Sequence, residues 1–275
     1  METKRSWETA VDSGTGSSKK LSHVESIQKC GYTIVKDLIN PGQIAAYLDV
    51  VKTLWEEEYR AGGLHCQRSP HHNVNNLPAR TRALADLIAN ETLSEINTSD
   101  FGEHHSLNEF RALNLLRCTE IPFMHRDSMM STLPTSPIRL YVILALEPFT
   151  KESGATFVVP GSNHFPFRPE PHLADLYERK VLEASPGSAI IFDANTWHGP
   201  SPNVSGASRW CLSMAFGHWF IKPRFDWLTK IGSEEFNGMS GRLKKLLGFN
   251  SRPPVDHLTR NETVLSCSDV KYTNA

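Results

Sequence analysis

The sequence lacks an apolar run long enough to cross a membrane. Its longest apolar stretches, such as residues 140–146, are far shorter than the roughly 20 residues that a membrane-spanning helix requires. The first twenty residues are rich in Ser, Gly, Thr and Lys and have no apolar centre, which argues against a secretory signal. We therefore expect a disordered tail over residues 1–20, no membrane partner and a cytoplasmic location.

Cysteine is scarce and shows no pairing pattern. The five cysteines are scattered and odd in number, and no two of them form a C-x-x-C pair. This argues against a disulfide framework and against a zinc site built from thiolates. We expect free thiols.

An excess of charge of either sign is also absent. The chain has 29 Lys and Arg residues against 30 Asp and Glu residues, which leaves a formal net charge of -1. Without a basic field, the chain has no general means of holding nucleic acid. We expect a small-molecule partner instead, and the composition leaves the oligomeric state open.

The composition that remains is that of a globular protein. The chain has 275 residues, of which 39% are hydrophobic and 21% are charged, and it contains neither an internal repeat nor a linker. We therefore expect a single domain over residues 21–275.

Helical patterns lie in the first third of the chain. Asn40 is a suitable cap for a helix whose apolar residues recur at helical spacing until Gly62 and Gly63 end it. A second helix is expected over residues 78–89, and a short one over residues 172–180. The segment 64–76 is interpreted either as a lid over a pocket or as a plain surface loop.

Strand patterns follow from about residue 109. Short runs rich in β-branched and aromatic residues alternate with turn-forming segments, a rhythm typical of an antiparallel sandwich or jelly roll. We expect a mainly β (α+β) fold with flanking N-terminal helices. The expected strands are residues 110–117, 138–147, 155–159, 188–193 and 209–217.

A candidate metal site begins with His125 and Asp127. In an extended backbone, residues two positions apart point to the same side, so both side chains can reach one ion. His198 follows a candidate strand 73 positions after His125 (from 125 to 198). Two histidines and one carboxylate on one side of a metal leave its other positions open, which suits ferrous iron.

Arg209 adds a second kind of ligand. It begins an apolar strand 11 residues after His198 (from 198 to 209), beyond a Pro-Asn-Val-Ser-Gly turn that can return the chain to the metal pocket. A buried guanidinium is costly unless a carboxylate meets it, and its fork matches a carboxylate bidentately. The pattern therefore favours a dicarboxylic acid as cosubstrate.

Taken together, these motifs resemble the phytanoyl-CoA dioxygenase family over nearly the whole chain. The resemblance rests on the order and spacing of His125-Arg-Asp127, the segment 147–164 with its Pro-Gly-Ser-Asn-His ending, and His198-Gly-Pro with Arg209. It implies a double-stranded β-helix (cupin-like jelly roll), with Fe(II) bound by His125, Asp127 and His198 and used together with O2. It also implies that Arg209 binds the distal carboxylate of 2-oxoglutarate and that Asn114 contacts this cosubstrate.

The resemblance also narrows the reaction. Related halogenases carry a small residue in place of the acid, whereas Asp127 is retained here, which favours hydroxylation or another oxidation of an unactivated C–H bond with release of succinate and CO2. Desaturation, ring closure and endoperoxidation stay open, as do a non-catalytic metal-binding jelly roll and a zinc hydrolase on the same ligands. Nothing in the sequence marks a coenzyme A site, so we expect a small molecule of specialised metabolism as substrate.

Overall fold

The computed structural model of the protein describes residues 22–62, 71–119, 124–128, 137–170 and 176–251. The expected tail over residues 1–20 lies outside these ranges. Within them, the strands form two sheets in which every strand pairing is antiparallel. The mainly β fold is therefore confirmed.

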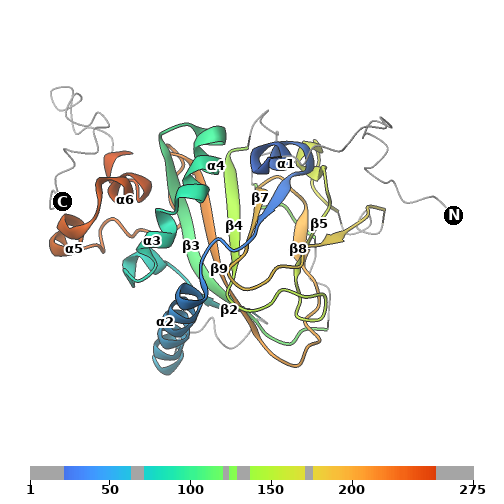
Figure 1. The fold of residues 1–275 in the computed structure, drawn as a ribbon, viewed down its shortest axis with the longest axis horizontal. Coiled ribbons are helices and arrows are strands. Elements are labelled where there is room, and N and C mark those ends of the chain that lie inside the picture. Colours follow the sequence, from blue (N-terminus) through green and yellow to red (C-terminus); the bar gives the residue numbers. More distant parts are fainter. Residues whose placement is uncertain (1–21, 63–70, 120–123, 129–136, 171–175, 252–275) are drawn as a thin grey trace.

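The larger sheet has six strands and the smaller sheet has three (Figure 1). In spatial order the larger sheet consists of β1 (Tyr32–Val35), β7 (Ala189–Asp193), β4 (Arg139–Ala145), β9 (Arg209–His218), β3 (His105–Leu115) and β2 (His71–Val74). The smaller sheet consists of β6 (Lys180–Val181), β5 (Thr156–Val158) and β8 (His198–Pro200). All five strands expected from the sequence are present, as β3, β4, β5, β7 and β9.

Alternation along β9 gives the larger sheet two different faces. Even-numbered residues from Trp210 to Phe216 belong to a large hydrophobic cluster shared with the helices, whereas Cys211 and Ala215 belong to a cluster shared with the smaller sheet. Successive side chains of a strand point to opposite faces, so residues 209, 211, 213 and 215 face the space between the two sheets.

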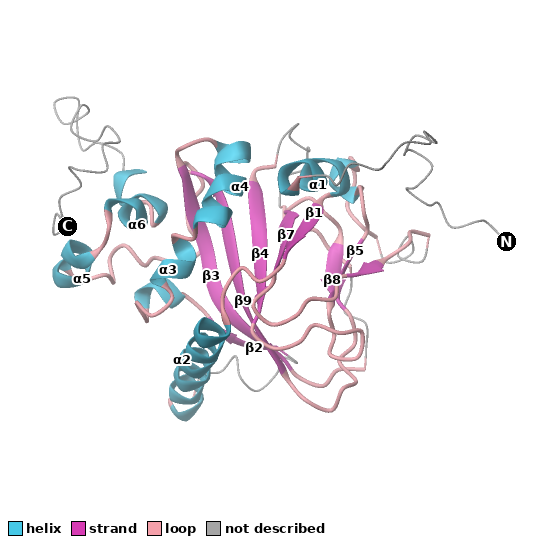
Figure 2. Ribbon diagram, viewed as in Figure 1, coloured by secondary structure: helices cyan, strands magenta, loops and turns pink. Residues whose placement is uncertain are grey.

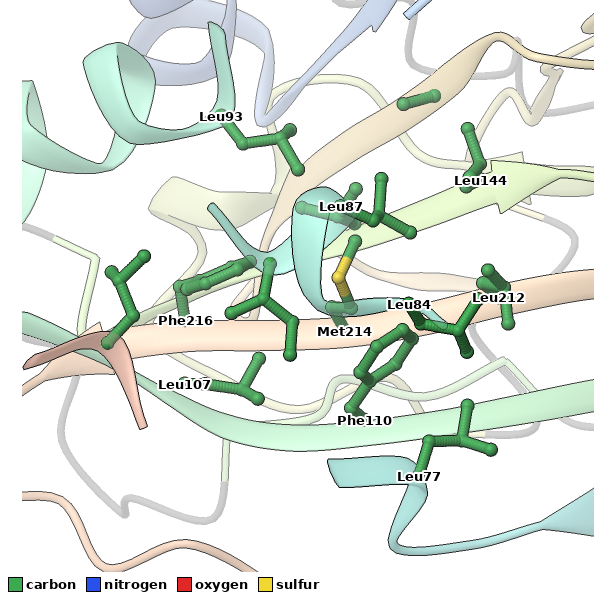
Figure 3. Close-up of a cluster of buried hydrophobic side chains, with 14 of the residues drawn as sticks. Leu77, Leu84, Leu87, Leu93, Leu107, Phe110, Leu144, Leu212, Met214 and Phe216 are labelled. Atoms are coloured by element: carbon green, nitrogen blue, oxygen red, sulfur yellow. The ribbon is translucent and has the colours of Figure 1, made fainter. Parts of the chain in front are cut away.

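Helices cover the outer face of the larger sheet, opposite the smaller sheet (Figures 1 and 2). Figure 3 shows Leu84 and Leu87 directed toward Phe110 of β3 and Met214 of β9. Among the described residues, no helix is both long enough and apolar enough to span a bilayer. The helices are α1 (His23–Cys30), α2 (Pro41–Arg60), α3 (Ala85–Ile88), α4 (Glu91–Phe101), α5 (Ser233–Gly238) and α6 (Gly241–Leu246), with 3-10 turns η3 (Leu77–Ala79), η4 (Ser162–His164) and η6 (Phe249–Ser251).

The start of α2 is confirmed in detail. The Asn40 side chain accepts a hydrogen bond from the Gln43 amide at 3.0 Å, and the Gln43 side chain accepts one from the Asn40 amide at 3.0 Å. This reciprocal pair satisfies two amides that a helix start otherwise leaves without partners. The helix ends at Arg60, and Gly62, two residues later, takes up a positive φ of 74°.

The single helix expected over residues 78–89 is wrong, because the segment is divided into η3 and α3. Between them, the Thr81 hydroxyl accepts a hydrogen bond from the Ala83 amide at 3.1 Å, which competes with helical pairing of that amide. The apolar periodicity still indicated burial correctly, since Leu84, Leu87 and Ile88 are buried.

The structure differs from two further expectations, a loop over residues 64–76 and a short helix over residues 172–180. Of the segment 64–76, residues 71–74 form β2, which pairs with β3 and extends the sheet, and the His72 ring stacks on Trp55 of α2 with centroids 4.0 Å apart. The remainder of the candidate lid up to residue 70 lies outside the described residues. The short helix expected over residues 172–180 is absent from the described part, where residues 176–179 are non-helical and β6 begins at Lys180.

Candidate metal centre

A short backbone ladder holds two of the candidate ligands side by side. The His125 amide donates to the His198 carbonyl at 2.9 Å, and the His198 amide donates to the His125 carbonyl at 2.8 Å. The Ser128 amide adds a bond of 2.9 Å to the Ala194 carbonyl. Because these bonds join segments far apart in the sequence, they set the distance between the two imidazoles, whose centroids lie 4.4 Å apart.

Asp127 completes the cluster. One of its carboxylate oxygens lies 3.6 Å from Nε2 of His125, and the other lies 3.4 Å from Nε2 of His198. One potential ligand atom from each of the three residues lies within 4.8 Å of the others. The structure therefore brings together the three side chains that the sequence predicted as ligands.

The tautomer of His198 follows from its other ring nitrogen. Nδ1 lies 2.9 Å from the Thr196 carbonyl oxygen, which can only accept a hydrogen bond, so Nδ1 carries a proton and Nε2 is the ring atom that faces Asp127 and is placed to bind a metal. The turn that holds Thr196 begins at Asp193, whose side chain accepts from the Asn195 amide at 2.9 Å. Burial raises the pKa of Asp193 to about 6.

The two histidines determine the charge state of Asp127. Burial alone would raise the pKa of this carboxyl, but the neighbouring His198 and His125 side chains lower it well below its usual range. A carboxylate with a depressed pKa stays ionised and available as a ligand at neutral pH. Two imidazoles and one ionised carboxylate are a donor set that fits ferrous iron.

The cluster opens into a cavity of about 320 Å³ between the two sheets. Strands β2, β3, β4, β7 and β9 supply one wall, and β5 and β8 supply the other. Arg209 lines this cavity, as do all three residues of the cluster. The turn between β8 and β9 therefore returns the chain to the pocket, as expected from the sequence.

Neutral oxygen atoms and an aromatic ring hold Arg209 in place. Its Nε donates to the Ser153 carbonyl at 3.2 Å, its Nη2 donates to the Gly154 carbonyl at 2.9 Å, and its guanidinium lies 3.8 Å from the centroid of the Phe149 ring. The residue is only 5% exposed, and this burial lowers the pKa of the guanidinium. A buried cation whose hydrogen bonds go to neutral carbonyls fits the recognition of an external carboxylate.

Gly154 permits this arrangement. Its φ is 77°, and a Cβ atom at this position would lie 2.9 Å from the Ser201 carbonyl oxygen and would also meet the Leu115 side chain. A side chain here would therefore push the backbone carbonyls away from Arg209.

Asn114 does not reach the cavity, so its expected contact with the cosubstrate needs correction. It pairs with Trp210 of β9 and His72 of β2 on the outer face of the sheet, whereas Leu113 and Leu115 line the cavity. The physical reason is the two-residue alternation of strand side chains, which places an even-numbered residue of β3 on the helix side.

Arg111 and Tyr141 are among the cavity residues that the sequence reasoning missed. Both lie on strands that the sequence did predict. Extending the alternation from Arg209 of β9 to its antiparallel neighbours would have found them, but the register between the strands is not visible in the sequence. Tyr141 stacks on Phe192 with centroids 5.7 Å apart, and burial raises its pKa.

Comparison with known sequences gives one family and several relatives. The model of the family described as phytanoyl-CoA dioxygenase (PhyH) matches residues 27–211. The uncharacterized protein Rv1501 of Mycobacterium tuberculosis is 32% identical over 111 residues, which are 40% of this chain and 40% of that protein. The match to this relative therefore covers well under half of its length. Dioxygenase af480 of Aspergillus fumigatus is 27% identical over 218 residues, covering 74% of this chain and 69% of the relative.

Comparison with solved structures agrees on the fold. The epimerase SnoN, in complex with Fe3+, alpha ketoglutarate and nogalamycin RO, superposes with a TM-score of 0.58 over 73% of this chain and 85% of SnoN at 17% identity. This likeness, together with the two antiparallel sheets, confirms the double-stranded β-helix. Because the family model matches more than half of its residues, the chain belongs to the phytanoyl-CoA dioxygenase family.

Proposed function

We propose that this protein is an iron(II)- and 2-oxoglutarate-dependent dioxygenase that hydroxylates or otherwise oxidises an unactivated C–H bond of a small molecule, releasing succinate and CO2. The observation that carries the proposal is the convergence of His125, Asp127 and His198 in one cavity with Arg209. The dioxygenase among the relatives, and the SnoN structure with its iron and alpha ketoglutarate, support it.

Each of the four side chains has a definite task in this proposal. His125, Asp127 and His198 would hold the iron on one side, so that the cosubstrate and O2 can meet on the other. Arg209 would bind the distal carboxylate of 2-oxoglutarate through the guanidinium edge that faces the cavity. Bound iron would activate O2, the oxidant, which no side chain of the chain can do.

The remaining walls would position the substrate and exclude water. Leu113, Ile143 and Phe192 give the cavity an apolar lining beside the candidate ligands. A dry, apolar wall limits side reactions of the activated oxygen and keeps the target C–H bond close to the metal. We place the reaction in specialised metabolism, because SnoN is described as an enzyme of nogalamycin biosynthesis.

The alternative reactions differ in the residues that they require in the cavity. Desaturation, ring closure and endoperoxidation need the same four residues and differ in how the substrate is placed. A zinc hydrolase needs a general base near the metal. Among the described residues that line the cavity, no carboxylate or histidine lies outside the triad, which disfavours hydrolysis.

Succinate formation tests the proposal. The protein is purified anaerobically and supplied with Fe(II), 2-oxoglutarate and O2, and succinate and O2 uptake are measured together. We expect iron-dependent succinate release that the variant Asp127→Ala loses. The matched control Asp49→Ala, on the exposed side of α2, keeps it. Absence of succinate from the wild type, or full turnover by Asp127→Ala, would contradict the proposal.

A further inference from the structure

A second arginine lines the same cavity as the candidate metal centre. Arg111 of β3 pairs with Ser213 of β9, whereas Arg209 of β9 pairs with Leu115 of β3. The two arginines are therefore four positions apart along this ladder, which corresponds to about 13 Å of strand. Because the separation is even, both side chains lie on the inner face of the sheet.

Glu109 neutralises only part of the positive charge around Arg111. Its side chain is 3% exposed, and its Oε1 atom lies 3.2 Å from Nε of Arg111 and 3.2 Å from Nη1 of Arg224. One carboxylate thus serves two guanidinium groups, so the group of three retains one positive charge. The Arg224 side chain is 59% exposed to solvent, whereas Arg111 is the member that lines the cavity.

The cosubstrate does not use this charge. In the proposed function, one carboxylate of 2-oxoglutarate meets the metal and the other meets Arg209. The two charges of the cosubstrate and that of Asp127 then balance those of a divalent metal and Arg209. The net positive charge of Arg111, Glu109 and Arg224 is therefore not balanced by the cosubstrate, and Arg111 is the member that presents it to the cavity. A net positive charge beside a partly desolvated cavity favours an anionic ligand.

The surroundings of Arg111 combine polar and apolar groups. Ser213 and Tyr141 bring hydroxyl groups to the wall, and Leu113 and Ile143 bring apolar surface. The guanidinium fork matches a carboxylate bidentately. At about 320 Å³ the cavity lies near the lower end of small-molecule sites, so the ligand that shares it with the cosubstrate is compact.

We propose that Arg111 anchors a carboxylate of the substrate, so that the enzyme acts on compact carboxylic acids with an apolar body. This inference rests on the proposed function. Arg111 is then the residue that selects substrates by charge, while Arg209 serves the cosubstrate.

Matched acids and amides test the inference. The probes are phenylacetate, 3-phenylpropionate and cinnamate, each compared with its primary amide. Their dissociation constants are measured by titration calorimetry on anaerobic protein saturated with Fe(II) and 2-oxoglutarate. In the wild type, we expect the acid to bind at least about tenfold more tightly than its amide for one pair or more, as a charge-assisted pair provides. In Arg111→Gln, we expect the acid and the amide to bind equally.

The control variant Arg80→Gln removes a comparable ion pair far from the cavity. The Arg80 side chain is 27% exposed and pairs with Glu58, while that of Arg111 is 25% exposed. Arg80→Gln should keep the preference for acids. If Arg111→Gln fails to fold, Arg111→Lys takes its place. Lysine keeps the charge but loses the fork, so the preference should fall several-fold.

Three results would overturn the inference. The first is that the wild type binds acid and amide equally in every pair. The second is that the Arg111 variant that folds keeps the full preference for acids. The third is that Arg80→Gln loses that preference. Titration of 2-oxoglutarate into the same proteins distinguishes a failure of the inference about Arg111 from a failure of the proposed function. If Arg111→Gln weakens 2-oxoglutarate binding, Arg111 serves the cosubstrate and only the inference fails. If the wild type binds no 2-oxoglutarate, the proposed function itself fails.

Discussion

Replacing Arg209 tests the proposed recognition of the cosubstrate most sharply. Arg209→Met keeps much of the volume and the apolar contact with Phe149 but removes the charge. In the protein without cosubstrate, the guanidinium bonds to the carbonyls of Ser153 and Gly154, and a neutral side chain leaves those two oxygens in a partly buried place. The variant should therefore be somewhat less stable, and its melting temperature is measured first.

The effect on affinity follows from the burial of Arg209. Truncating one partner of a buried charge pair costs about 2–5 kcal/mol in binding. The metal retains the other end of 2-oxoglutarate, so we expect the lower part of this range, about 2–3 kcal/mol, or roughly 30- to 150-fold in the dissociation constant. Arg209→Lys should lose less affinity for 2-oxoglutarate, because lysine keeps the positive charge and lacks only the two-pronged guanidinium group.

A second ligand turns this measurement into a double-mutant cycle. The acid 2-oxobutyrate has the metal-binding end of 2-oxoglutarate but no distal carboxylate. Calorimetry on anaerobic, metal-loaded protein should show that 2-oxobutyrate binds the wild type and Arg209→Met with equal affinity. By contrast, 2-oxoglutarate should bind Arg209→Met more weakly than it binds the wild type. If both ligands weaken to the same extent, Arg209 acts on the fold and not on the distal carboxylate, and the reasoning is refuted.

Two further predictions concern the framework around His198. The raised pKa of Asp193, about 6, means that the folded protein favours its protonated form, so stability from this group is present below about pH 4 and lost as the pH rises through 6. In urea unfolding, the free energy of unfolding of Asp193→Asn should rise by about 2–3 kcal/mol relative to that of the wild type between pH 4 and pH 7. A difference between the two proteins that stays constant with pH would contradict this. Gly31→Ala should lower the free energy of unfolding by about 2–5 kcal/mol, because Gly31 has a φ of 85° and a Cβ atom there would meet Thr196 and lie 2.9 Å from Asn163 Oδ1. Gly206→Ala, with φ 81° and no neighbour within 4 Å, should cost only about 1–2 kcal/mol, and equal losses would exclude the steric argument.

The strands could be predicted from the sequence because each carries a local signal. The five expected runs are rich in β-branched and aromatic residues and are bounded by turn-forming segments, and the cap at Asn40 is likewise local. β2 was missed because His71–Val74 is polar and is a strand only through its pairing with β3. The helix α4 was missed although Asn90 caps it at 3.1 Å, because its apolar residues are few.

The site was predictable where its geometry is local and unpredictable where it depends on register. His125 and Asp127 share a side because they are two positions apart. The order of His198 and Arg209 after them carried the resemblance to the family. Asn114 was assigned to the wrong face, and Arg111 was overlooked, because the pairing of β3 with β9 decides which residues of β3 face the cavity.

The location of a bound metal tests the central claim most directly. Crystals of the protein are soaked anaerobically with Fe(II) and 2-oxoglutarate, and anomalous diffraction is recorded at the iron edge. We expect one peak, about 2.0–2.2 Å from a side-chain atom of each of residues 125, 127 and 198, with the 2-oxoglutarate density extending toward residue 209. A peak bound elsewhere, or one that residue 198 does not contact, would contradict the account.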